Sequence, residues 1–67
     1  MNTNDFSVGE KVTYINIGVK EHGIVKEIPE HTTTEIRVVY RCNNEWFRYQ
    51  DYTSQLTPIK YLQKGWV

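Results

Sequence analysis

The sequence has a single cysteine, Cys42, no long run of apolar residues and no excess of either charge. One cysteine cannot form an intrachain disulfide, so nothing in the sequence indicates an oxidising compartment. No run approaches the ~18 apolar residues of a membrane-spanning helix, and the first residues lack the basic and apolar regions of a signal peptide. These absences predict a cytoplasmic protein without a membrane partner.

The charge is balanced, with eight basic and eight acidic residues and a formal net charge of zero. This balance argues against a general nucleic-acid coat protein, because such proteins gain affinity mainly by neutralising phosphates. It leaves room for a local basic patch. It also lowers the repulsion between copies, so that a homo-oligomer is compatible with the sequence.

Residues that carry out catalysis or bind metals are scarce. His22, His31 and Cys42 are the strong soft ligands, and their spacings match no close ligand pair. Nucleophilic catalysis by Cys42 would need a base and an orienting group, and a lone thiol at a hairpin tip, with no pocket implied in so small a barrel, is more often inert. The glycines stand singly and form no phosphate-binding loop. The sequence therefore predicts no enzyme, no metal site and no cofactor.

The length of 67 residues predicts one domain, which we place at residues 6–67 after a flexible N-terminus at 1–5. A domain this small buries only about 60% of the surface that its unfolded chain exposes. The aromatic share of 13% suits such a core, because each ring buries a large area.

The first half of the chain predicts two strands, Lys11–Ile17 and His22–Ile28. Apolar and polar residues alternate in the first strand, which is the period of a half-buried strand. In the second strand Gly23 and Val25 face one way, and Ile28 breaks the period. A glycine combined with a phase slip indicates a bulge or a strong bend.

The stretch Thr34–Tyr52 is predicted to form a central hairpin. Asn43-Asn44 tolerates the positive φ of a tight turn, and the residues on both sides alternate as strands do. The register that keeps apolar residues together sets a core face of Ile36, Val38, Tyr40, Phe47 and Tyr49. The opposite, outer face then holds Arg37, Val39, Arg41, Trp46 and Arg48.

The C-terminal stretch predicts a short 3₁₀ turn, Ile59–Leu62, followed by a last strand at Trp66-Val67 that pairs with the first strand. Five short strands separated by turn signals indicate an all-β sandwich or barrel. We favour a five-stranded barrel, because closure removes the open edges of a small sheet.

Three stretches of the chain, FSVGEKVTY, EHGIVKEI and YTSQLTPIKYLQKGWV, carry a family resemblance. They resemble small SH3-like barrels of the KOW and Tudor type, in which Gly23-x-Val25 is similar to the glycine-containing strand. The third stretch also resembles the ending of small proteins encoded by bacteriophages and other mobile elements. The resemblance implies an SH3-like barrel that binds partners without catalysis. A phage origin would imply an accessory protein acting on a host component in the host cytoplasm, such as an inhibitor of a bacterial defence system.

The outer hairpin face is the candidate partner-binding site. Trp and Arg are the residue types most often found as interface hot spots, so our first hypothesis is a protein-binding module that docks a host protein on this face. The second hypothesis is nucleic-acid binding, with bases stacked on Trp46 and arginines at phosphates. Self-association through the same apolar spot or through an unpaired strand edge is a third possibility, and a solvated face on which Arg41 covers Trp46 is a fourth.

Overall fold

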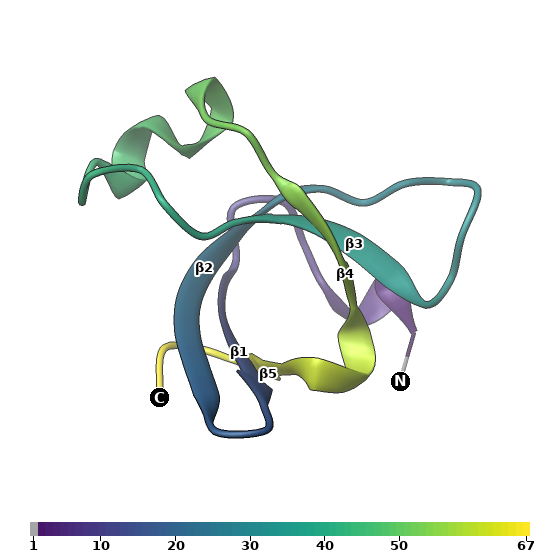
Figure 1. The fold of residues 1–67 in the computed structure, drawn as a ribbon. Helices are drawn as coiled ribbons and strands as arrows, with labels where there is room; N and C mark the ends of the chain where they lie inside the picture. The colour runs from purple at the N-terminus through teal and green to yellow at the C-terminus, as the bar shows by residue number, and fades with distance from the viewer. Residues whose placement is uncertain (1) are drawn as a thin grey trace.

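The computed structural model describes residues 2–67 and shows one antiparallel sheet with short 3₁₀ turns between some of its strands. Within these residues the sheet has five strands: β1 (Lys11–Asn16), β2 (Val19–Glu27), β3 (Glu35–Val39), β4 (Gln55–Pro58) and β5 (Leu62–Lys64). Their order is β4-β3-β2-β1-β5, so that β4 and β5 form the two edges. The sheet curls around a central core, as Figure 1 shows, and no pairing between β4 and β5 closes it within the described residues.

The inner side of the curled sheet holds the main core. β-branched residues of the first three strands point inward at alternate positions, which is the arrangement that the strand period predicts. The cluster comprises Phe6, Val12, Val25, Ile36, Val38, Ile59 and Leu62.

The strand β2 connects the two halves of the sheet. Its register against β3 shifts between Val25 and Glu27, which confirms the predicted irregularity. Gly23 lies where the inner side is most crowded: a Cβ there would stand 2.6 Å from Val38 Cγ1 and 3.0 Å from Tyr40 Cδ1. Only glycine fits this position without displacing its neighbours.

The predicted central hairpin is wrong beyond its turn. The turn itself exists: Asn43 and Asn44 have φ of 51° and 63°, and Glu45 donates its N–H to the Cys42 carbonyl at 2.8 Å. The segment that follows is not a strand but the 3₁₀ helix η2 (Trp46–Asp51). The antiparallel partners of β3 are β2 and β4, so the predicted pairing with the Trp46 segment does not form.

The core face predicted for that hairpin is therefore only half correct. Ile36 and Val38 are fully buried, and Tyr40 packs against the core cluster. Phe47, which was expected in the core, is 81% exposed because it belongs to η2.

The 3₁₀ turn before the last strand is confirmed as η3 (Ile59–Tyr61). The last strand begins directly after it and pairs with β1, as expected, but its residues are Leu62–Lys64. Trp66-Val67, predicted as that strand, lies beyond it. Gly65 separates them with φ of 82°, which turns the chain out of the sheet.

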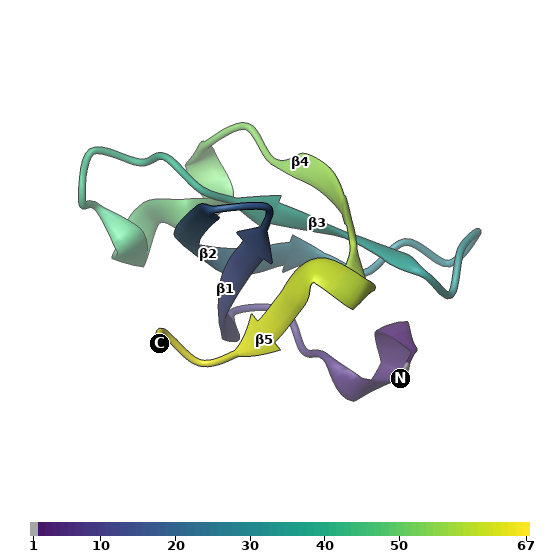
Figure 2. The ribbon, with the colours of Figure 1, turned by 60° about the horizontal axis from the view of Figure 1, so that its bottom comes forward.

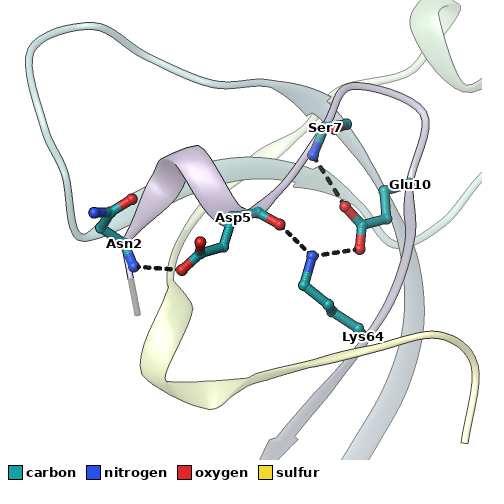
Figure 3. A network of polar contacts seen from close by, with 5 residues as sticks. All are labelled: Asn2, Asp5, Ser7, Glu10 and Lys64. Carbon is teal, nitrogen blue, oxygen red and sulfur yellow. Dashed lines mark hydrogen bonds and ion pairs between the residues drawn. The ribbon is translucent and has the colours of Figure 1, made fainter.

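The N-terminal segment predicted to be flexible contains the 3₁₀ turn η1 (Thr3–Asp5); Met1 lies outside the described residues. Figure 3 shows how side chains join this segment to β5. Lys64 Nζ donates to the Asp5 carbonyl and, at 3.0 Å, to Glu10 Oε2. The same ammonium lies 4.6 Å from the centroid of the Phe6 ring, an arrangement that favours a cation–π contact.

No helix among the described residues is long and apolar enough to cross a membrane.

Figures 1 and 2 agree in placing η1 and η2 at opposite ends of the molecule, with the C-terminal residues nearer to η2 than to η1.

Candidate functional site

The five residues predicted for the outer hairpin face do not share one surface. Val39 is fully buried, because it pairs with Ile24 on the outer side of the sheet and that side is covered. Neither residue belongs to the main core cluster, so the sheet buries apolar side chains on both of its sides. The cover on the outer side comes from η2, which contacts β2.

The three arginines of the predicted site each stand beside a carboxylate. Arg37 Nε lies 3.3 Å from Glu27, and Arg41 Nε lies 3.8 Å from Glu21. Arg48 in η2 faces two carboxylates, Asp51 at 3.2 Å and Glu45 at 3.9 Å. All of these pairs are exposed and contribute little to stability. Their charges are nevertheless matched locally, so they do not add up to a basic patch.

Trp46 keeps its place as a candidate contact residue but has different neighbours. Its ring packs against Trp66 with centroids 4.9 Å apart, and His22 stacks parallel on Trp66 at 5.1 Å. Lys11 Nζ lies 4.8 Å from the Trp66 ring centroid, and Phe47 follows Trp46 in η2. We call these residues the aromatic surface: Lys11, His22, Trp46, Phe47 and Trp66.

The position of Trp66 is set by hydrogen bonds to the first two strands. The indole Nε1 donates to the Gly23 carbonyl at 2.9 Å. On the same side Thr13 Oγ1 donates to the Gly65 carbonyl at 2.7 Å and accepts from the Val67 N–H at 3.1 Å. Thr13 is fully buried, and these two bonds satisfy its hydroxyl group.

The position of Trp46 is set by the turn that precedes it. Glu45 ends the turn. Its carbonyl oxygen accepts a hydrogen bond from the Arg48 N–H at 2.8 Å. Its carboxylate accepts from the Tyr52 hydroxyl at 2.6 Å, and this bond raises the pKa of Tyr52. Both ends of η2 are thus tied to Glu45, which fixes where Trp46 and Phe47 stand.

A second aromatic group lies on the inner side, between the two edges of the sheet. Tyr14 makes edge-on contacts with Tyr40 at 6.0 Å and with Tyr61 at 5.9 Å. The Tyr40 hydroxyl shares a 2.9 Å hydrogen bond with Thr57, and burial raises the pKa of Tyr40 to about 12. A concavity beside these rings is lined by Tyr14, Glu21, Tyr40 and the residues of β4. These tyrosines fill the space between β4 and β1.

Chemically, the aromatic surface offers ring faces and one ammonium group, that of Lys11. Within residues 2–67 no three His, Cys, Asp or Glu side chains are grouped so that they could hold a metal ion. Cys42 is 2% exposed and therefore shielded from solvent. Rings of this size with a flanking cation suit non-covalent contact with another molecule.

Sequence reasoning missed Lys11, His22 and Trp66 as members of one surface. The signal for the first two was present: alternation in β1 and β2 places both on the side opposite Val12, and Thr13 pairs with His22. Nothing in the sequence placed Trp66 against β2, because the two are 43 residues apart and only the fold joins them.

Comparison of the chain with protein-family models, with curated proteins and with solved structures found no match.

Proposed function

We propose that this chain is a non-catalytic protein-binding module and that the aromatic surface is its contact site. The observation that carries the proposal is the contiguous ring cluster in which His22 stacks on Trp66 and Trp46 packs against Trp66 at a tilt of 59°. Phe47 follows Trp46 and is 81% exposed. When a partner covers an exposed apolar ring, the complex is stabilised. Full burial of a Phe side chain contributes on the order of 2 kcal/mol.

Protein is favoured over nucleic acid as the partner because of how the cations are placed. All three arginines face carboxylates, and the net charge is zero. Nucleic-acid binding without sequence preference depends on unmatched cations along a groove. Lys11 over the Trp66 ring would suit stacked bases, and this contact supports the nucleic-acid alternative.

The fold supports the finer proposal of an SH3-like barrel. The sheet order β4-β3-β2-β1-β5, with the 3₁₀ turn η3 between β4 and β5, is compatible with such a barrel left open at one seam. A phage origin, a host partner and inhibition of a defence system remain predictions from the family resemblance.

The test begins with capture from a bacterial lysate, with and without nuclease, by the wild-type protein and by Phe47→Ser. Val8→Ser is the matched control, since Val8 is 51% exposed but lies outside the aromatic surface. A captured protein is then purified and titrated against the three proteins by calorimetry.

We expect Phe47→Ser to weaken binding by at least about tenfold, which corresponds to about 1.4 kcal/mol. Val8→Ser should bind like the wild type. Equal affinities for Phe47→Ser and the wild type would show that the aromatic surface is not the contact site. Captured material that disappears with nuclease, and whose binding weakens steeply with added salt, would favour nucleic acid instead.

A further inference from the structure

The turn between β1 and β2 carries backbone strain that its own structure does not explain. The strands pair up to Asn16 and Val19, which leaves a two-residue turn of Ile17 and Gly18. Ile17 has φ of 40°, in the left-handed region where a β-branched side chain is a genuine outlier. Asn or Gly at this position would form the same turn without that strain.

Packing does not account for Ile17 either. Its side chain is 94% exposed, and the flanking Val19 and Ile15 are 51% and 42% exposed. A strained residue whose side chain is almost fully exposed points to a role outside its own fold. This turn forms the lower tip of the hairpin in Figure 1.

The tip carries one cation without a partner. Lys20 pairs with Ile15 across the hairpin, and none of the ion pairs among residues 2–67 includes it. A surface that receives the tip should therefore offer an apolar cavity with a carboxylate at its rim.

Such a cavity exists on the chain itself. A concavity beside the first residue of β3 is lined by Thr34, Glu35, Pro58, Ile59 and Lys60. Pro58 is the more exposed of its two apolar lining residues, since Ile59 belongs to the core cluster and is only 5% exposed. The Ile59 N–H donates to the Thr34 carbonyl at 2.9 Å and holds this segment in place. Glu35 makes no ion pair within residues 2–67. The ammonium group of Lys60 lies over the Tyr61 ring, 5.1 Å from its centroid.

We propose that the Ile17 tip of one copy of this chain seats in the concavity of a second copy. Ile17 lies against Pro58 and Ile59, and Lys20 pairs with Glu35 across the contact. The zero net charge removes the general repulsion that would oppose such an association. Because tip and concavity are different surfaces, the contact is heterologous and leaves one of each free, so copies add in rows.

The proposal shares no residue with the aromatic surface and does not depend on it. A contact made by one side chain and one ion pair is small, so the association should be weak and visible only at high protein concentration.

The first measurement follows ¹⁵N–¹H NMR spectra of the wild-type protein between about 20 µM and about 1 mM, the range in which so small a contact would associate. We expect resonances of Gly18 and of Glu35 to shift together with concentration. Ile17→Asn should abolish both shifts and raise the urea midpoint, because Asn relieves the turn; it therefore tests the contact without unfolding the protein. Val8→Asn, at an exposed apolar residue elsewhere, should shift like the wild type.

A mixing experiment tests the direction of the contact. Labelled Ile17→Asn protein, whose concavity is intact, is mixed with unlabelled Glu35→Lys protein, whose tip is intact. Shifts should appear at Glu35 and Lys60 of the labelled chain, and they should be absent when the unlabelled protein is also Ile17→Asn.

Spectra that stay unchanged up to about 1 mM would overturn the proposal, since even a contact of this small size should then be populated. Shifts confined to the tip, or confined to the aromatic surface, would also overturn it. Tip resonances that move only on addition of phosphatidylglycerol vesicles would assign the tip to a lipid surface instead. None of these outcomes bears on the capture experiment with Phe47→Ser, so the two proposals fail separately.

Discussion

The indole N–H of Trp66 donates to the carbonyl oxygen of Gly23 at 2.9 Å, which joins the second-last residue of the chain to the middle of β2. The bond fixes the orientation of the Trp66 ring. His22 stacks on this ring in parallel, with 4° between the two ring planes. The arrangement of the aromatic surface therefore depends in part on this backbone carbonyl, together with the Thr13 bonds to Gly65 and Val67.

Replacement of Trp66 by Phe removes this donor while it keeps an aromatic ring. The part-buried Gly23 carbonyl then loses its partner, and we expect the free energy of unfolding to fall by about 1–2 kcal/mol. Trp46→Phe is the matched control, because the hydrogen bonds found among residues 2–67 include none from the Trp46 indole. Urea unfolding of both variants provides the comparison, and equal losses would mean that the Gly23 bond contributes nothing specific.

Replacement of Gly23 by Ala tests how closely the neighbouring side chains pack against this residue on the inner side of the sheet. The added methyl group would stand 2.6 Å from Val38 Cγ1 and 3.0 Å from the Val39 carbonyl oxygen, so strand β3 must shift. We expect a loss of about 2–3 kcal/mol in the free energy of unfolding, typical of an overpacked core.

Gly18→Ala provides the comparison for that loss. No atom lies within 4 Å of its added methyl group, and its cost comes only from φ of 77°, on the order of 1 kcal/mol. A Gly23→Ala protein that is no less stable than Gly18→Ala would contradict the crowding described for β2.

The strands that the sequence predicted well are those whose pattern is local. In β1, alternation over six residues indicates a strand without reference to the rest of the chain. The bulge in β2 could be predicted because Gly23 and the phase slip at Ile28 are both visible in the sequence. The turn at Asn43-Asn44 was predicted for the same reason: Asn tolerates positive φ, and both residues adopt it.

The structure of the segment after that turn could not be predicted, because it depends on residues elsewhere in the chain that this segment covers. Trp46, Phe47 and Tyr49 resemble a strand in a short window, and a 3₁₀ helix of six residues has no distinct signal of its own. What decides the outcome is that Ile24 and Val39 face the outer side of the sheet and need a cover. Such a demand appears only once the register of β2 and β3 is known.

The five candidate residues are not brought together on one surface for that same reason. Arg37, Arg41 and Arg48 were grouped by a register that does not form, and each instead meets a nearby carboxylate. Trp46 is still a candidate contact residue. A partly exposed Trp suits contact with a partner protein whether a strand or a helix carries it.

Tyr40 gives a prediction for the pH dependence of stability. Burial raises the pKa of its hydroxyl from 10.0 to about 12, so the folded protein holds this proton more tightly than the unfolded chain does. Below pH 10 both states keep the proton and its contribution to stability is fully present. As the pH rises from 10 towards 12, the unfolded chain ionises first, and the free energy of unfolding should fall.

Urea midpoints measured across that pH range test the assignment. Tyr40→Phe cannot ionise, so its stability should fall less steeply than that of the wild type, although it also loses the 2.9 Å hydrogen bond to Thr57. The slope with pH, rather than the absolute stability, is therefore the quantity to compare. Tyr52 has a raised pKa from its bond to Glu45 and should leave a residual slope in the variant. Equal slopes for the two proteins would place the alkaline loss of stability on groups other than Tyr40.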